Sequence, residues 1–266
     1  MVESAVNYIA RIDERPYYYL HETPPDTPWR NTRGDTRTVA IENARTLDPP
    51  PTLDDRGFTV VHHETRVDDL YDTERVRDAY YGEMEELVAR VTNAARVIAF
   101  DHNVRHAELA QQPDTVAQNP VHLVHNDYTE ASGPQRVRDL VSANEVEDLL
   151  RGRFAVINVW KPIRGPVRVA PLAICDATSM SASDFVETDL RYPDRTGEIY
   201  SVVFNPSHRW FYYPDMQANE AMLLKCYDSD SDRARFTAHT AFEDPASEPG
   251  APPRESIEVR TMAFFS

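Results

Sequence analysis

The sequence predicts a mainly β protein with flanking helices, folded as a barrel or a double-sheet jelly roll. Its C-terminal half contains many short runs of β-type sequence and few helical patterns, which is typical of such folds. The chain of 266 residues has only eight glycines and no glycine-rich phosphate loop, which disfavours a doubly wound α/β fold. Because β barrels of this length commonly form one domain, we expect a single domain over residues 1–266.

The first 55 residues are expected to form an N-terminal arm and loops, followed by a jelly-roll core with flanking helices over 56–266. Within the arm, residues 5–20 and 39–43 are strand candidates, and the segment 21–37, rich in Pro, Thr and Asp, is predicted as an ordered loop.

Two helices are predicted. Asp72 or Thr73 can cap a long helix that runs to about residue 95, because apolar residues recur in it at steps of three and four. Its other face is charged, so we expect this helix to pack on a sheet. Ser142 and Glu145 have capping-box spacing and predict a short helix that ends at Gly152.

The remaining β-type runs are separated by turn signals, and residues 107–120 are predicted as a loop. The strand candidates are 57–61, 96–101, 153–160, 167–175, 198–205, 209–213, 221–227, 236–242 and the last run up to Phe265.

The net charge of −16 argues against binding to nucleic acid or to anionic membranes. No apolar run is long enough to span a bilayer, and no secretory signal is recognisable. Two cysteines, Cys175 and Cys226, do not make a disulfide framework, so we expect a protein of the reducing cytoplasm.

A candidate metal motif follows the β-type run that begins at Val121. His125 and Asp127 are two residues apart, and on a strand such side chains point to the same face. With His239, in another β-like run, they could form the facial triad of two histidines and one carboxylate that holds non-haem Fe(II). The alternatives are a surface His–Asp pair near a turn and a histidine buried in the core.

A second motif opens the last strand candidate. Arg254 and Ser256 would share one face, and a guanidinium with a hydroxyl makes a good clamp for a carboxylate. The alternative is a strand with exposed polar residues, in which Arg254, Ser256, Glu258 and Arg260 alternate with Ile257, Val259 and Thr261.

In this order, the motifs resemble the Fe(II)/2-oxoglutarate-dependent oxygenases, and in particular their hydroxylase/desaturase-like branch. That branch includes relatives of the cephamycin methoxylase component, aspergillic-acid hydroxylase and gibberellin desaturase. The resemblance runs in family order from about residue 55, over the blocks 96–105, 125–129, 157–162, 171–176, 197–200, 205–214, 224–230 and 252–260.

The resemblance implies a double-stranded β-helix with iron held by His125, Asp127 and His239. Arg254, helped by Ser256, would bind the distal carboxylate of 2-oxoglutarate, with Arg260 in reserve for that role. Halogenating relatives replace the carboxylate ligand with a small residue, so Asp127 argues against halogenation.

The expected reaction is oxidation of an unactivated C–H bond of a small secondary metabolite, by hydroxylation or desaturation, with succinate and CO2 as co-products. It would use Fe(II), 2-oxoglutarate and O2, with ascorbate as an additive in vitro, and a homodimer is one candidate assembly. Two alternatives stay open: a metal-dependent jelly-roll enzyme that does not use 2-oxoglutarate, and a non-catalytic accessory subunit. Candidate substrate contacts are Tyr128, Trp160, Lys161, Arg105, Arg209 and Tyr212.

Overall fold

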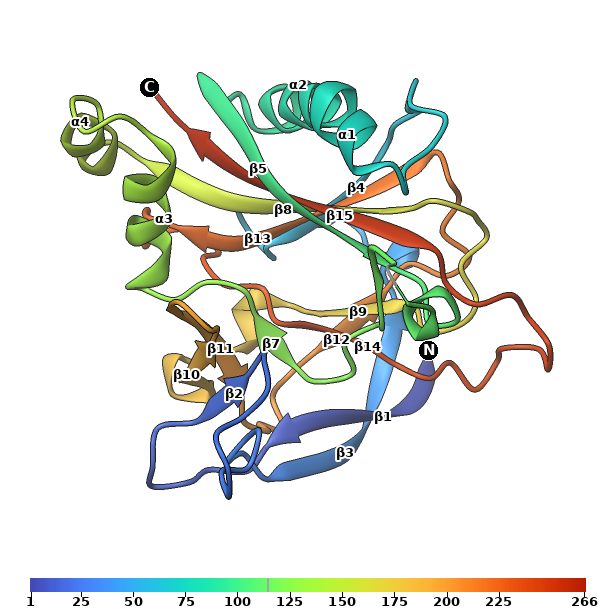
Figure 1. Cartoon of the computed structure of the whole chain (residues 1–266). Helices are drawn as coiled ribbons and strands as arrows, with labels where there is room; N and C mark the ends of the chain where they lie inside the picture. The colour runs from blue at the N-terminus through green and yellow to red at the C-terminus, as the bar shows by residue number, and fades with distance from the viewer. Residues whose placement is uncertain (114) are drawn as a thin grey trace.

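Two β-sheets face each other, and helices flank them (Figure 1). The structure is a computed structural model and describes residues 1–113 and 115–266. The largest apolar core lies between the two sheets, and a second core lies between one sheet and the helices that cover it. This arrangement confirms the predicted mainly β class with flanking helices.

The first sheet has nine strands, in the order β1, β3, β12, β9, β14, β7, β11, β10 and β2. In the same order, their bounds are Val2–Ile9, Gly34–Asn43, Trp210–Tyr212, Leu172–Cys175, His239–Ala241, His125–Asn126, Thr196–Val202, Phe185–Arg191 and Tyr17–Tyr19.

The second sheet has six strands, in the order β4, β13, β8, β15, β5 and β6. In the same order, their bounds are Phe58–His62, Glu220–Asp228, Phe154–Pro162, Ser256–Phe264, Arg96–Arg105 and Ala117–Gln118. The central strands β8 and β15 are antiparallel over their whole length.

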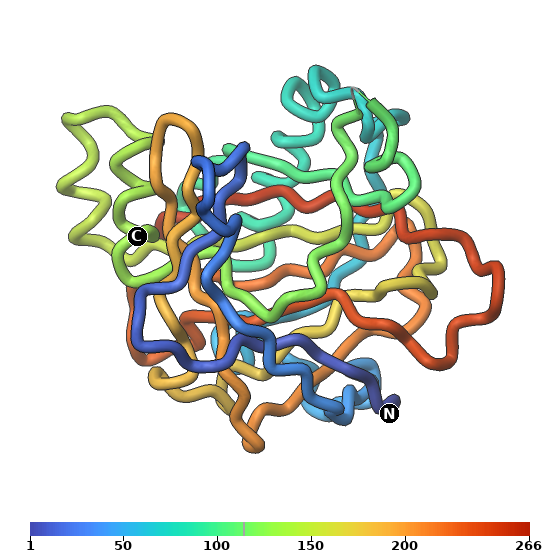
Figure 2. The backbone as a smooth tube through the Cα atoms, turned by 60° about the horizontal axis from the view of Figure 1, so that its bottom comes forward, coloured from blue at the N-terminus to red at the C-terminus, as the bar shows by residue number. Residues whose placement is uncertain are grey.

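The N-terminal arm is part of the nine-stranded sheet. β1 pairs with β3, and β2 lies beside β10, as the blue segments in Figure 2 show. The backbone N–H of Val124 also donates to the carbonyl of Asn7 at 2.9 Å, so this sheet curls back on itself. β3 starts at Gly34, inside the segment predicted as a loop. The sequence did not reveal this start, because the mostly exposed side chains of β3 show no alternation of apolar and polar residues.

The long helix forms as predicted and covers the outer face of the six-stranded sheet. The Asp72 carboxylate caps it by accepting from the backbone N–H groups of Glu74 and Arg75. It consists of α1 (Thr73–Arg75), a π-helical turn labelled η2 (Val76–Tyr80) and α2 (Tyr81–Thr92). It ends before residue 95 because Asn93 takes the left-handed conformation, with φ 57°.

The helix predictions differ from the structure in two places. Helix α3 (Ser132–Leu140) was not predicted, because only Gly133 and Val137 of this polar segment are buried and no apolar pattern marks it. The following helix, α4 (Val146–Arg151), has no capping box, since the Ser142 hydroxyl donates to the Glu145 carboxylate instead. The remaining short 3-10 turns are η1 (Ala44–Thr46), η3 (Leu109–Gln111), η4 (Ala177–Ser179) and η5 (Ala182–Asp184).

Strand predictions also missed their ends in places. β10 was not predicted, and β9 is shorter than the predicted run 167–175. Within the predicted loop 107–120, the structure contains η3 and β6, and residue 114 lies outside the described residues.

The two faces of β15 differ in polarity. Ile257 and Val259 point to the core under α2. By alternation, Ser256, Glu258 and Arg260 point into the space between the sheets. The polar residues that could have been exposed therefore line the interior of the fold.

Among the described residues, no helix is long and apolar enough to cross a membrane.

Packing of α2 against the six-stranded sheet can be tested with Leu87→Ala. Leu87 is fully buried in this core, so we expect a loss of about 2–5 kcal/mol in the free energy of unfolding, measured by urea denaturation. The exposed neighbour Glu86 supplies the control, because Glu86→Ala should change the free energy of unfolding by less than about 0.5 kcal/mol. Equal stability of the two variants would contradict this packing.

Candidate metal centre and carboxylate site

Two histidines on neighbouring strands point toward each other in the space between the sheets. His125 on β7 and His239 on β14 are paired across the antiparallel ladder, and their ring centroids lie 4.5 Å apart. Nδ1 of His125 lies 2.7 Å from the carbonyl of Leu123, and Nδ1 of His239 lies 3.0 Å from the carbonyl of Thr237. A carbonyl only accepts, so each Nδ1 carries the proton and each Nε2 keeps a lone pair for a metal.

Asp127 completes a group of three potential metal ligands. Its Oδ1 lies 3.5 Å from Nε2 of His125, and one ligand atom from each of the three residues lies within 4.8 Å of the others. Burial, followed by the neighbouring His239, lowers the pKa of His125 to about 4, so its ring is neutral at pH 7. Burial would raise the pKa of Asp127, but Arg260 and then the two histidines lower it well below its usual range. Two imidazole nitrogens and one carboxylate are a donor set that fits a divalent metal ion.

Asn126, between His125 and Asp127, connects this motif to the segment that carries His239 through hydrogen bonds. Its amide nitrogen donates to the carbonyls of Tyr128 at 2.7 Å and Cys226 at 2.8 Å. Its amide oxygen accepts from the backbone N–H of Thr237 at 3.1 Å, two residues before His239. Sequence reasoning missed this residue, because only the fold brings residues 126 and 237 together.

Arg254 and Ser256 lie in the same interior and have unused hydrogen-bonding atoms. The Arg254 guanidinium donates to the carbonyl of Ala170 at 2.7 Å and lies over the ring of Trp160, 5.6 Å from its centroid. Nε of Arg254 and Oγ of Ser256 are buried and have no partner among the described residues. Such atoms are costly to leave unpaired, so the pair fits an absent anionic acceptor such as a carboxylate.

Arg260, in contrast, already has its partners. Its Nε donates to Oδ2 of Asp127 at 2.9 Å, and its Nη1 donates to Oδ2 of Asp101 at 2.8 Å. Its Nη2 lies 3.5 Å from Oε1 of Glu258. The guanidinium is therefore not free to bind the carboxylate of a ligand, which leaves Arg254 as the better candidate for that role.

Three of the predicted substrate contacts lie near this interior. Arg105 on β5 pairs with Ser256 on β15, and its Nη1 donates to the side chain of Gln118 at 2.8 Å. Burial, and after it the neighbouring charge of Arg105, lowers the pKa of Arg254 to about 9. Trp160 and Tyr128 are both buried in the core between the sheets.

The other three predicted contacts lie elsewhere. Lys161 follows Trp160 on β8 and points to the opposite face, where its ammonium donates to the carbonyls of His63 and Ala218. Arg209 forms an ion pair with Asp176, which follows β9, whereas Ala170 with Arg254 lies before it. The Tyr212 ring packs edge-on against Phe242, in the core enclosed by the curled sheet. Strand alternation explains the position of Lys161, because neighbours on a strand point to opposite faces.

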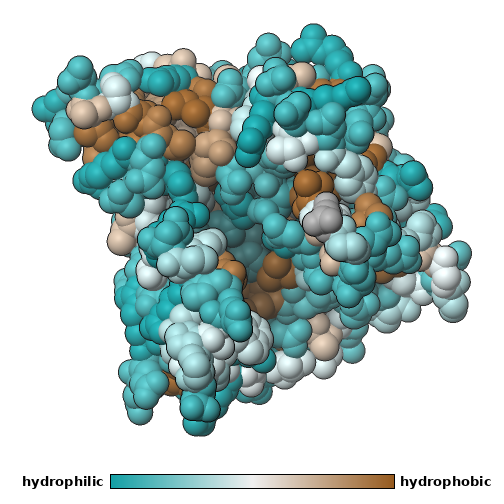
Figure 3. Space-filling model, viewed as in Figure 1, coloured by the Kyte–Doolittle hydropathy of each residue, from teal (hydrophilic) through white to brown (hydrophobic). Residues whose placement is uncertain are grey.

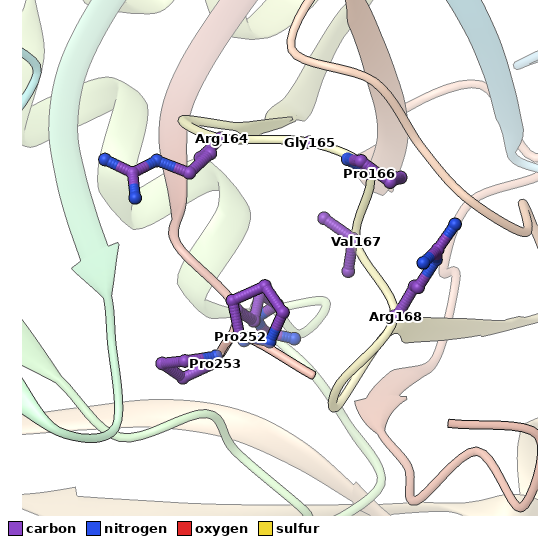
Figure 4. Close-up of a pocket in the computed structure, with 8 residues that line it drawn as sticks. Arg164, Gly165, Pro166, Val167, Arg168, Pro252 and Pro253 are labelled. Atoms are coloured by element: carbon purple, nitrogen blue, oxygen red, sulfur yellow. The ribbon is translucent and has the colours of Figure 1, made fainter. Parts of the chain in front are cut away.

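The surface is hollowed at the centre of the face in Figure 3, and the walls of this hollow are mainly hydrophilic. A pocket of about 110 Å³ is lined by residues 164–168 and 252–254, and Arg254 is among them (Figure 4). This volume is well below the about 300–1,000 Å³ of typical ligand pockets, so the pocket is too small for a drug-sized organic substrate.

Comparison with known proteins agrees with this geometry. The family model described as "Oxidoreductase/YMDC permease-like domain" matches residues 6–264. The hydroxylase/desaturase efuI of Hormonema carpetanum is 32% identical over 86% of this chain and 84% of its own length. The alpha-ketoglutarate-dependent dioxygenase phiK of a fungal species is 33% identical, over 87% of this chain and 85% of its own.

A solved structure is similar over almost the whole chain. It is that of the iron and alpha-ketoglutarate-dependent endoperoxidase NvfI, with a TM-score of 0.89, 27% identity and coverage of 99% of this chain and 98% of the other. The match confirms the predicted jelly roll, and the relatives give no support to an enzyme without 2-oxoglutarate or to an accessory subunit. The chain belongs to the Fe(II)/2-oxoglutarate-dependent oxygenases, in their hydroxylase/desaturase branch, and its cosubstrates are 2-oxoglutarate and O2.

Proposed function

We propose that His125, Asp127 and His239 bind the Fe(II), and that Arg254 with Ser256 binds the distal carboxylate of 2-oxoglutarate. One observation carries this assignment: the three potential ligands share an interior with a buried guanidinium and hydroxyl that have unpaired atoms. A dicarboxylate that reaches from the metal to Arg254 would satisfy both groups.

Each residue has a defined task in this scheme. The carbonyls of Leu123 and Thr237 accept from Nδ1 of His125 and His239, so the Nε2 atom of each ring is the one left to face a metal. Arg254 and Ser256 orient 2-oxoglutarate through charge-assisted hydrogen bonds. When bound, Fe(II) supplies the oxygen activation that couples conversion of 2-oxoglutarate to succinate and CO2 with substrate oxidation.

The substrate is a small organic molecule, in keeping with the family. We infer hydroxylation or desaturation of an unactivated C–H bond in a secondary metabolite, which agrees with the names of the relatives. Arg105, Trp160 and Tyr128 are the candidate residues for the substrate chamber, because each lies beside Ser256, Arg254 or Asp127.

We further infer that the chain works as a single domain in the cytoplasm. Pairing of β1 with β3, and of β2 with β10, supports the first inference, since it joins the arm to the rest of the fold. The buried free thiols of Cys175 and Cys226 support the second. A homodimer is the assembly we would test first.

Turnover of 2-oxoglutarate tests the assignment of Arg254. We expect Arg254→Ala to raise the 2-oxoglutarate concentration needed for half-maximal succinate formation by about 10- to 100-fold, because a hydrogen bond to a charged group contributes about 1.5–3 kcal/mol. His239→Ala should abolish succinate formation. Succinate is measured by mass spectrometry after incubation with Fe(II), O2 and ascorbate.

Arg209→Ala is the matched control. Arg209 pairs with Asp176, which follows β9, whereas Arg254 contacts Ala170, which precedes β9. We expect its 2-oxoglutarate dependence to equal that of the unmodified protein. An unchanged dependence in Arg254→Ala would show that another residue binds the distal carboxylate, and succinate formation by His239→Ala would refute the proposed metal site.

A further inference from the structure

The two oxygens of the Asp127 carboxylate have different surroundings. Oδ2 accepts a hydrogen bond from the Asn158 amide at 2.8 Å and one from Nε of Arg260 at 2.9 Å. Oδ1 instead faces the histidines, 3.5 Å from Nε2 of His125. Both donors therefore act on one oxygen and leave the other exposed to the proposed metal position.

The donors themselves are held in place by the six-stranded sheet. Arg260 on β15 is directly opposite Asn158 on β8 and Asp101 on β5. The Arg260 guanidinium is fixed by Oδ2 of Asp101 at 2.8 Å and lies 3.5 Å from Oε1 of Glu258. Asn158 is fully buried. Arg260 cannot leave Asp127 without giving up its contact with Asp101, and burial within β8 holds Asn158 beside the carboxylate.

This arrangement limits how the carboxylate can meet a metal ion. A carboxylate that binds through both oxygens occupies two coordination positions, and one that binds through a single oxygen occupies one. With two histidines and a single carboxylate oxygen, an octahedral ion keeps three positions open. Two-oxygen binding by Asp127 would reduce these to two, too few for a chelating 2-oxoglutarate and O2 together.

We propose that Arg260 and Asn158 are positioning residues that restrict Asp127 to one-oxygen metal binding and so keep the third coordination position open. The proposal rests on the assignment of Asp127 as a metal ligand. It gives Arg260 a role distinct from 2-oxoglutarate binding, and it differs from a simple counterion role, because a counterion needs only charge whereas positioning needs Nε in its place.

Cobalt(II) in place of iron provides a readout that does not depend on turnover, since its visible spectrum responds to the number and geometry of its ligands. We would titrate Co²⁺ into the full-length protein and into Asn158→Ala and Arg260→Lys. Each variant removes one donor from Oδ2, and Arg260→Lys keeps the charge. We expect Kd for Co²⁺ to rise by about 10- to 100-fold, with altered band shape and intensity. Wild-type spectra and affinity in both variants would overturn the proposal.

Rescue by lysine separates the two roles of Arg260. If Arg260→Lys gives the wild-type spectrum and Kd, the charge alone matters and the positioning role of Arg260 is wrong. Asn158→Ala leaves no unpaired cation and therefore decides the question if Arg260→Lys does not fold. Its melting temperature and circular dichroism establish that the fold is retained.

Two further variants make the outcome unambiguous. Arg153→Lys is the matched control, because Arg153 also pairs with a buried carboxylate, Asp228, at 2.7 Å, and we expect its Co²⁺ spectrum to be unchanged. Asp127→Ala tests the assumption beneath the proposal. Wild-type Co²⁺ binding by Asp127→Ala would refute the metal site itself, whereas lost binding in that variant with unchanged spectra in Asn158→Ala and Arg260→Lys would refute only the positioning role.

Discussion

The Asp127 carboxylate, whose side chain is only 9% exposed, is the group on which the rest of the site depends. A carboxylate enclosed between two sheets must be balanced by hydrogen bonds and opposite charge, because burial alone disfavours its ionised form. Arg260 and Asn158 provide this balance from the six-stranded sheet, and the histidines approach from the nine-stranded sheet. The site therefore exists only where the two sheets meet. This explains why its parts come from both halves of the sequence, from residue 125 to residue 260.

Polar residues on the inner face of β15 follow from the same requirement. Ser256, Glu258 and Arg260 line the interior, while Ile257 and Val259 pack under α2. A strand between a reactive interior and a covering helix must reverse the usual pattern, in which polar residues face water. Helix α2 therefore supports the site indirectly, because it packs against the apolar face of the six-stranded sheet.

Much of this could be predicted from the sequence, and the failures have physical causes. Alternation along the last strand correctly separated Arg254, Ser256 and Arg260 from their apolar neighbours, but alternation alone does not say which face is inside. The family resemblance was confirmed, and the three proposed ligands do lie together. Alternation along β8 places Lys161 on the opposite face from Trp160, and Asn126 was missed because its partner Thr237 is distant in sequence. Helix α3 was missed because it buries only two residues.

The central claim is that one interior chamber binds Fe(II) through His125, Asp127 and His239 and 2-oxoglutarate through Arg254. The most direct measurement is an anaerobic titration of the metal-free protein with Fe(II) and then with 2-oxoglutarate, followed by visible absorption. We expect the weak charge-transfer band of the iron–2-oxoglutarate chelate, absent from His239→Ala and requiring more 2-oxoglutarate in Arg254→Ala. A protein that binds Fe(II) but shows no band with 2-oxoglutarate would contradict the account.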